Sequence, residues 1–470
     1  MSGTAAGGEP TAYGIFEGMS TTTERPAAAP SGHTVEKQGI RWSVGSEPVA
    51  RTLLKDNDHT IQAGFNAESV AKAVLNKVPI LYGGGDEHRR QRAAVARYFA
   101  PKVVDERYRD RMNAEAEMAE AELLARGVID LDPVALNYSM TVAAAVIGLN
   151  YSSIPGMGKR LESFFKAPRL ADSSNWDQWR ENAKGMARLG RFWAMDVRPA
   201  IKAHRDQEID DVMGHMVKDG YKDQEILIEC ITYAAAGMVT TREFISKAAL
   251  VMLENPELLA DYRSGDTERR YAVLHEILRV HPVVTRLSRR VVADYTMPTV
   301  EVAEAAVANR RMRTGKVNAR DEAVREAEEQ AKIAAGLAPE TVDETAAELA
   351  TLAETATASG CPVDHHALAQ GEAIDIDVYS VNTDPITAGE CPEKYVVGRT
   401  LPSQVKADVL GFGDGAHRCP GAFLAIRETD VLLQRLLRHD LELVSDVDYG
   451  LDDMISSYSV RNVRLKLVKP

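Results

Sequence analysis

The sequence predicts a mainly α-helical fold with small β-sheets. Residues 105–215 read as a series of amphipathic helices separated by glycine, proline and turn residues, and one longer helix is predicted over 223–254. Strand-like pieces are short, at 40–44, 294–298 and 373–381. With 45% hydrophobic residues in 470, the chain can bury a sizeable core. These observations favour an α+β class in which helices dominate.

The composition argues against several classes of protein. Acidic residues outnumber basic ones 69 to 56, and the net charge of −13 argues against a nucleic-acid partner, which needs a basic surface. The longest apolar run, Met140–Leu149, is too short to span a bilayer, so no membrane anchor is expected. The 4 cysteines lie far apart without paired spacing, which is typical of a reducing cytoplasm. We therefore expect a cytoplasmic protein.

The first third of the chain divides into a leader and a folded part. Residues 1–38 are predicted to be a disordered leader, and 39–470 a single domain. The strand at 40–44 leads into a helix at 48–55, and a glycine run opens a second helix within 83–101.

The helices that follow have clear start and stop signals. Gly127 and Pro133 separate two of them, and Asp223 is the expected N-cap of the long helix. Asn255-Pro256 ends that helix, and further helices are predicted over 256–263 and 271–280.

The most informative stretch runs from Phe412 to Gly421 and leads into an apolar-periodic segment at 422–437. Its three glycines let the backbone pass close to a flat group because they carry no Cβ. The start of a helix directly after Cys419 would stabilise a thiolate through the positive end of the helix dipole. A buried structural cysteine after a glycine-rich turn is the alternative for Cys419 taken alone.

The whole stretch resembles the haem-ligating segment of the cytochrome P450 family, Phe-x-x-Gly-x-His/Arg-x-Cys-x-Gly. The resemblance implies haem b as the cofactor, with its iron bound by the Cys419 thiolate. Phe412, Gly413, His417 and Gly421 are implied as further haem-binding residues.

The resemblance extends over roughly residues 40–298 and 372–470. It implies the mostly helical, triangular P450 fold with small sheets, of the soluble bacterial type. His88 and Arg92 match the family's His-x-x-x-Arg, which clamps a haem propionate, and their spacing places them on one helix face. Arg289 is the further residue implied to reach a propionate, with Arg290 as an open alternative.

The centre of the long helix, 236–241, resembles the family's Ala/Gly-Gly-x-Asp/Glu-Thr-Thr. The resemblance implies that Ala236 lies against the haem face and that Thr240, with Thr241, is catalytic as a hydrogen bonder on the oxygen side. Val239 occupies the acidic position, and because it cannot donate a proton, the usual acid–alcohol relay is incomplete. A hydrogen bond from Thr240 to its own helix carbonyl is the alternative role for this hydroxyl.

Three charged residues match a structural ion-pair network of the family. Glu276 and Arg279 form its Glu-x-x-Arg on one helix face, and Arg399 is the candidate third member. The segment that follows is implied to pass the substrate side, so Val283 and Val284, with Ala236, are tentative pocket residues.

An insertion separates two strands that a short hairpin joins in the family. It covers 299–371, is rich in Ala, Glu and Arg, and has helix-like pieces at about 317–335 and from Pro339 onward. We expect a helical hairpin or a partly disordered flap, with a partner-docking module as the alternative.

The function implied by the resemblance is that of a haem-thiolate monooxygenase. It would oxidise an apolar small molecule with O2 and electrons from a ferredoxin and ferredoxin reductase. Because Val239 replaces the acid, a peroxide-driven or otherwise atypical haem-thiolate enzyme is one alternative. A non-enzymatic haem-thiolate ligand binder or sensor is the other.

Overall fold

The computed structural model describes residues 33–64, 77–151, 156–158, 160–161, 175–307, 312–313, 365–402, 405–452 and 456–468; for 175–182, 306–307 and 312–313 it describes the backbone alone. The leader up to residue 32 and the helix-like pieces predicted at 317–335 and from Pro339 onward therefore lie outside the described residues.

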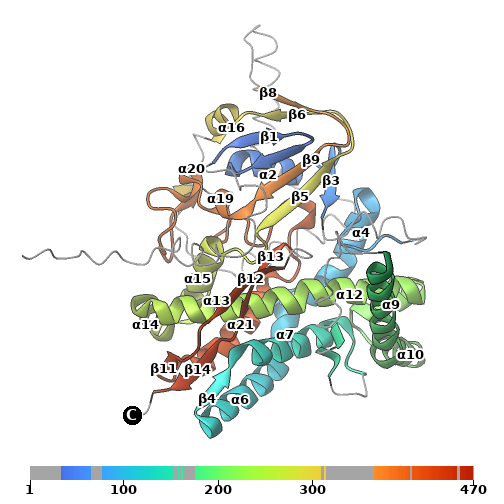
Figure 1. Ribbon diagram of the computed structural model, residues 1–470, viewed down its shortest axis with the longest axis vertical. Coiled ribbons are helices and arrows are strands. Elements are labelled where there is room, and N and C mark those ends of the chain that lie inside the picture. The colour runs from blue at the N-terminus through green and yellow to red at the C-terminus, as the bar shows by residue number, and fades with distance from the viewer. Residues whose placement is uncertain are drawn as a thin grey trace, which may run out of the picture.

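Helices make up most of the molecule, which confirms the predicted fold class. In Figure 1 the helical part fills the lower half and the largest sheet lies in the upper half. The helices are α2 (Glu47–Lys55), α4 (Gly85–Ala96), α5 (Pro101–Val103), α6 (Arg109–Arg126), α7 (Leu131–Ile147), α9 (Asn175–Phe192), α10 (Arg198–Asp206), α11 (Val212–Lys218), α12 (Asp223–Ala234), α13 (Thr240–Glu254), α14 (Pro256–Ser264), α15 (Thr267–Val280), α16 (Val300–Val307), α19 (Val378–Asn382), α20 (Pro385–Ala388) and α21 (Ala422–Leu436). Short 3-10 and π segments join several of them: η1 (Arg97–Phe99), η2 (Val104–Tyr108), η3 (Trp193–Val197), η4 (Ala235–Val239) and η5 (Gly415–His417).

The largest sheet has the strand order β1-β2-β9-β5-β3. Strands β2 and β9 are parallel, and the other neighbours in this sheet are antiparallel. The register places Val44 opposite Ile376 and Ile376 opposite Leu287, so an apolar row faces α2. Its strands are β1 (Val35–Gln38), β2 (Arg41–Val44), β3 (Thr60–Ala63), β5 (Arg286–Val291) and β9 (Ala373–Asp377).

The described residues also form four smaller sheets. β4 and β11 flank β14 in one of them, and the other three are the pairs β12–β13, β6–β8 and β10–β7. Their bounds are β4 (Val128–Asp130), β6 (Tyr295–Pro298), β7 (Met312–Arg313), β8 (His365–Leu368), β10 (Leu401–Pro402), β11 (Leu441–Leu443), β12 (Asp448–Asp452), β13 (Ser457–Arg461) and β14 (Arg464–Leu467).

Two sheet elements differ from the sequence prediction. Strand β1 lies inside the stretch 1–38 that we expected to be a disordered leader, because Val35–Gln38 pairs antiparallel with β2. The strand predicted at 373–381 ends at Asp377. The Asp377 carboxylate accepts hydrogen bonds from the Tyr379 and Ser380 amides and so caps α19.

The predicted insertion begins and ends inside a hairpin. β6 pairs antiparallel with β8, so residues 365–371, which we assigned to the insertion, belong to the sheet framework. The first residues of the insertion form α16, whose Ala303 is fully buried in the core beside α2. The insertion therefore starts as an ordered helix packed on the framework.

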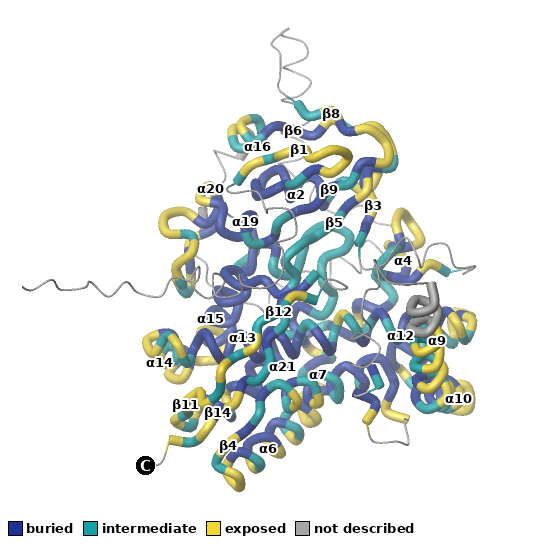
Figure 2. Tube along the Cα trace, in the orientation of Figure 1, coloured by how far each residue is buried: buried dark blue, intermediate teal, exposed yellow. Residues whose placement is uncertain are grey.

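Helix α13 runs through the centre of the helical part. Every residue from Thr241 to Met252 is buried, and Figure 2 shows this helix dark blue along its length. α7, α21 and the strand β13 pack around it. Among the described helices, none combines the length and the hydropathy needed to cross a lipid bilayer.

Candidate functional site

The Cys419 loop lies between β10 and the start of α21 and includes the one-turn η5. The Cys419 amide donates to the Phe412 carbonyl at 2.9 Å, which closes the loop. Gly415 has φ +65, and a Cβ there would lie 2.1 Å from the Leu54 carbonyl oxygen. Only glycine fits at this position, so Gly415 is required by the packing and also matches the motif.

The loop is half-buried throughout residues 411–421, whereas Val409–Leu410 before it and Ala422–Leu424 after it are buried. A glycine-rich segment that other side chains leave partly exposed can receive a flat ligand. Burial raises the pKa of the Cys419 thiol, while the Gly421 amide and the arginines Arg92 and Arg418 lower it. These donors and cations are suited to stabilising a thiolate bound to iron.

The predicted long central helix is interrupted at the candidate site. Its first part, α12, begins after Lys222, whose amide donates a hydrogen bond to the Glu225 carboxylate, so the predicted N-cap Asp223 is wrong by one residue. The π-helical segment η4 (Ala235–Val239) then joins α12 to α13. Such segments recur at functional sites because they displace one turn of the helix.

The sequence did not predict the π segment, although a run of small residues lies at its start. Ser139 of α7 donates to the Met238 carbonyl at 3.0 Å, which satisfies a backbone group in the irregular turn. Thr240 donates to the Ala236 carbonyl at 2.5 Å, the alternative role that the sequence left open. Ala236 is exposed between the half-buried Ala235 and Gly237, so the uncovered face of the helix lies at the residue predicted to meet the haem.

No acidic side chain replaces Val239 from the following turn. Val239 is buried and apolar. Glu243 lies one turn beyond Thr240, but its carboxylate accepts from Arg242 at 2.8 Å, Arg461 at 2.7 Å and the Val460 amide at 2.8 Å. A carboxylate held by these donors has a structural role.

Thr241, which we predicted to be catalytic together with Thr240, is buried. It hydrogen-bonds the carboxyl group of Glu428 on α21, and burial raises the pKa of that carboxyl well above its usual value. Thr241 therefore belongs to the contact between α13 and α21, and of the two threonines only Thr240 adjoins the uncovered turn at Ala236.

Several contacts bring the central helix and the cysteine loop together. The Arg92 guanidinium donates to the Arg418 carbonyl. The Phe99 ring stacks on Tyr233 of α12 with centroids 6.4 Å apart, and a Cβ at Gly421 would lie 3.7 Å from the Phe99 ring. Residues from α4, η1, α12 and the loop thus lie in one network of contacts.

A basic cluster adjoins these contacts. It contains His88, Arg92 and Arg289, which we predicted to bind the propionates, and His417, which we predicted as a further haem-binding residue. The rings of His88 and His417 stack with centroids 4.3 Å apart. Burial is the largest cause, and the charge of Arg92 the second, of the low pKa of His88, which is about 4. Burial, and to a smaller extent His88, lowers the pKa of His417 well below its usual value. Burial also lowers the pKa of Arg289 to about 10.

The cluster has few counter-charges within the described chain: Asp56 raises the pKa of Arg289, but burial lowers it by more. No ion pair there joins an acidic side chain to any of its four members. The Nε2 atom of His88 and the Nε atom of Arg289 are buried without a hydrogen-bond partner. Burial and the neighbouring Arg92 and Arg289 keep both histidines neutral near pH 7. The two arginines, with these unpartnered nitrogen atoms beside them, form an environment that a bound dianion satisfies.

The residues present fit haem on these grounds. The uncovered loop and the exposed Ala236 offer two apolar faces, and the basic cluster with its orphaned donors matches two carboxylates at one edge. Arg289 lies in this basic cluster, as expected of a residue that binds a propionate, whereas Arg290 is exposed on the other face of β5. Arg289 also donates to the Leu54 carbonyl at 3.2 Å, which fixes it on the sheet.

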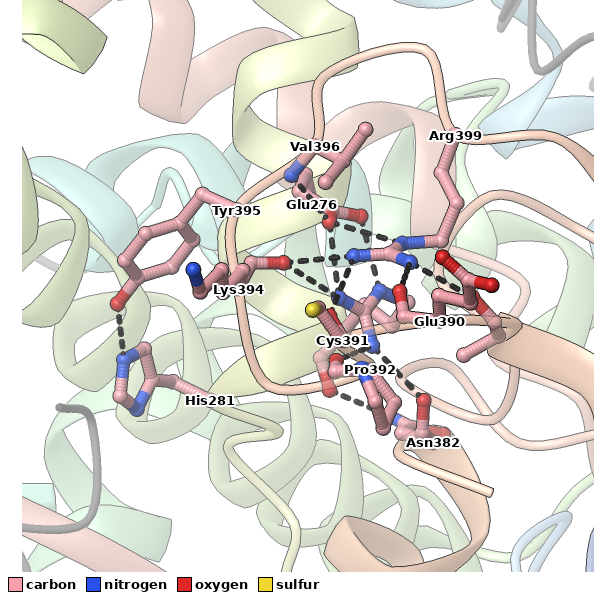
Figure 3. Close-up of polar contacts among 12 residues, drawn as sticks. Glu276, His281, Asn382, Glu390, Cys391, Pro392, Lys394, Tyr395, Val396 and Arg399 are labelled. Carbon is pink, nitrogen blue, oxygen red and sulfur yellow. Dashed lines mark hydrogen bonds and ion pairs between the residues drawn. The ribbon is translucent and has the colours of Figure 1, made fainter. Parts of the chain in front are cut away.

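Glu276, Arg279 and Arg399 form a buried network (Figure 3). The Arg279 guanidinium makes two hydrogen bonds of 2.8 Å to the Glu276 carboxylate, and Arg399 Nε lies 3.3 Å from the same group. Both arginines also donate to the Lys394 carbonyl, at 3.2 Å and 2.7 Å. The network ties α15 to the irregular segment before the cysteine loop.

The tentative pocket residues separate in the structure. Val283 is buried within the main hydrophobic core. Val284 is half-buried and bridges to Ser457 at the start of β13. Of these two valines, Val284 has the surface with which a ligand could be in contact.

The segment before α4 is held to the central helix by carboxylates. The Lys77 amide donates to Glu225 at 3.0 Å, and the Ile80 amide to Glu229 at 2.8 Å. Burial raises the pKa of Glu229 to about 8, and the Ile80 hydrogen bond offsets this only in part. This anchoring sets the start of α4, which carries His88.

Glu229→Gln is expected to change how stability depends on pH. Folded Glu229 keeps its proton up to about pH 8, while the unfolded chain loses it near the ordinary glutamate pKa. Wild-type stability therefore falls as pH rises through this window, and the variant lacks that loss. Urea unfolding at about pH 5.5 and about pH 7.5 should show the variant gaining on the order of 2 kcal/mol relative to wild type. An equal difference at both pH values would contradict the raised pKa.

Comparisons with known proteins agree with this geometry. A family model described as cytochrome P450 matches residues 351–449. Cytochrome P450-SOY of Streptomyces griseus is 24% identical over 269 residues, which are 54% of this chain and 61% of the relative. The chain thus aligns with about 61% of the length of this curated relative.

Solved structures share the fold over nearly the whole chain. P450BioI, in a complex with an acyl carrier protein, has a TM-score of 0.64 at 16% identity and covers 93% of this chain and 95% of its own. CYP109B1 from Bacillus subtilis has a TM-score of 0.63 at 17% identity, covering 92% and 96%. The chain thus has the fold of these cytochromes P450, and its cysteine loop lies within the residues that match the family model. The cofactor of that family is a haem with cysteine-thiolate ligation.

Proposed function

We propose that the chain is a haem-thiolate monooxygenase that inserts one oxygen atom of O2 into an apolar small molecule. The observation that supports this most is the half-buried Cys419 loop, which lies in one network of contacts with α12 and adjoins a basic cluster that makes no ion pair to an acidic side chain within the described chain. In the reaction, the substrate gains one oxygen atom, and two electrons and two protons convert the other to water. Bound haem supplies the iron at which O2 is reduced.

The residues have separate roles in this proposal. Cys419 would hold the haem iron through its thiolate, which would donate electron density to the metal. His88, Arg92, Arg289 and His417 hold the propionates, with Phe412, Gly413 and Gly421 around the sulfur. Thr240 turns its hydroxyl from the Ala236 carbonyl toward the oxygen side, where it holds a hydrogen bond and relays a proton.

Electrons come from NAD(P)H through a ferredoxin and its reductase, and the protein works in the cytoplasm. The wide spacing of the cysteines and the lack of a membrane-crossing helix among the described ones support this setting. The solved structure of P450BioI with an acyl carrier protein that carries hexadec-9Z-enoic acid makes long-chain fatty acids reasonable first probes.

A peroxide-driven enzyme is the second candidate, because Val239 is apolar and Glu243 is held by Arg242, Arg461 and Val460. Peroxide already brings two protons and two electrons, so it bypasses the delivery that Val239 leaves incomplete.

Val239→Asp separates the two candidates. With ferredoxin, reductase and NADPH, we expect the variant to convert at least several-fold more of the consumed NADPH into hydroxylated fatty acid, because a carboxyl restores proton delivery beside Thr240. Peroxide-driven turnover should not rise. Val239→Asn is the matched control, being polar but not acidic. Product from peroxide alone would favour the second candidate, and no product from either source would favour a ligand binder or sensor.

A further inference from the structure

Asp408 is a fully buried carboxylate at the entrance of the cysteine loop, and no motif of the sequence drew attention to it. Its Oδ2 atom accepts from the Phe412 amide at 3.2 Å and lies 3.6 Å from Nη1 of Arg418. Its Oδ1 atom lies 3.4 Å from Nδ1 of His275 on α15. One carboxylate thus contacts the first residue of the loop, the residue before Cys419, and the helix behind them.

These contacts converge on the cysteine. The Phe412 carbonyl receives the Cys419 amide at 2.9 Å, and Arg418 also donates to the Gly413 carbonyl at 2.9 Å. The ring of His275 meets the ring of Phe412 edge-on, with centroids 6.4 Å apart and planes at 77°. The position of the Cys419 backbone is therefore determined by groups that Asp408 and His275 hold.

The backbone next to Asp408 is strained. Val409 has φ +53, which is rare for a β-branched residue because its side chain crowds the backbone there. Such a conformation persists only where surrounding contacts impose it, and strained residues cluster at functional sites. The turn is closed by the Gly411 amide, which donates to the Asp408 carbonyl at 2.8 Å.

The charge of Asp408 is retained despite burial. Burial opposes ionisation, but Arg418 and then His275 hold the pKa of the carboxyl well below its usual value. The carboxylate therefore offsets the positive charge of Arg418 beside the sulfur. Without this carboxylate, the positive charge of Arg418 would act on Cys419 uncompensated.

We propose that Asp408, supported by His275, is a positioning residue for Cys419, because it ties together both ends of the segment Phe412–Arg418 and balances the Arg418 charge. Its effect on the iron rests on the proposed function, whereas its effect on the loop does not.

Asp408→Ala and Asp408→Asn separate the two effects in the haem-loaded protein. Asn can still accept from the Phe412 amide, whereas Ala cannot, so hydrogen exchange of the peptide 412–419 should increase at least tenfold in D408A and less in D408N. Both variants should shift the reduction potential of the iron to a more positive value, because a negative charge near the thiolate is lost.

Asp430 provides the matched control. It is buried on α21, pairs with Arg270 at 2.8 Å, and accepts from Tyr262 at 2.9 Å, away from the loop. D430A and D430N should lower stability without raising exchange in 412–419 or moving the potential. Equal effects in the Asp408 and Asp430 variants, or unchanged loop exchange in D408A, would overturn the proposal.

A milder variant keeps the test decisive if D408A does not fold. His275→Phe leaves the carboxylate in place but removes its support from α15, and it should still increase exchange in 412–419. Unchanged exchange in H275F would then contradict the proposal. A wild-type protein without the spectrum of a haem thiolate would overturn the proposed function, while the exchange data would still decide the role of Asp408.

Discussion

Glu276→Gln is expected to leave at most a tenth of the haem-loaded protein that wild type yields. Glutamine has nearly the same shape, but it removes the only carboxylate contacting the fully buried Arg279 and the mostly buried Arg399 among the described residues. Removing one partner of a buried ion pair costs about 3–5 kcal/mol, because the remaining charge is left in a medium that cannot solvate it. A typical domain has a total stability of only about 5–15 kcal/mol.

The loss should extend to haem because of where the network lies. The Val396 amide donates to Glu276 at 2.8 Å, and Arg399 donates to the Ala388 carbonyl at 2.6 Å, so the segment before the cysteine loop is anchored on this carboxylate. The ratio of Soret to 280 nm absorbance and the urea unfolding free energy measure the two effects.

Glu117→Gln is the control for Glu276→Gln. Glu117 is more than half exposed and pairs with Arg435 at 2.6 Å on the surface. Exposed pairs contribute about 0–1 kcal/mol, so the variant should load haem as wild type does. Normal haem content in E276Q, or an equal loss in E117Q, would contradict the structural role of the network.

Arg289→Met is expected to have opposite effects on the haem-free and the haem-loaded protein. In the haem-free protein, burial disfavours the Arg289 charge more than the nearby Asp56 favours it, so removal of this charge should leave stability unchanged or raise it. In the loaded protein the variant lacks a donor to a propionate. Haem transfer to an acceptor protein should then be at least tenfold faster, which corresponds to about 1.4 kcal/mol.

Arg290→Met provides the matched control, because Arg290 is the next residue of β5 and is exposed. It should leave haem transfer unchanged. Faster haem transfer from R290M than from R289M would show that the adjacent residue, which the sequence left as an alternative, binds the propionate.

The local motifs of the sequence were sufficient to place most of the site. The spacing of His88 and Arg92 fixes one helix face, and the ends of the helices follow from proline and glycine, as at Gly127 with φ +70. These features depend on neighbouring residues, so a single sequence contains them.

What the sequence could not provide depends on contacts between distant segments. The π segment relies on Ser139 of another helix, and the role of Glu243 is set by Arg461, 218 residues away. Strand β1 could not be seen because its four residues are largely polar and exposed, and only pairing with β2 orders them. Asp408 likewise gains its importance from His275 on a distant helix.

The proposed function depends most on Cys419 as the ligand of haem iron. The direct test is the absorption spectrum of the dithionite-reduced protein with carbon monoxide, with wild type measured beside Cys419→Ser after reconstitution with haem. We expect a strongly red-shifted Soret band in wild type that is absent from the variant. A folded wild type that takes up no haem, or whose band is typical of histidine or neutral-thiol ligation, would contradict the account.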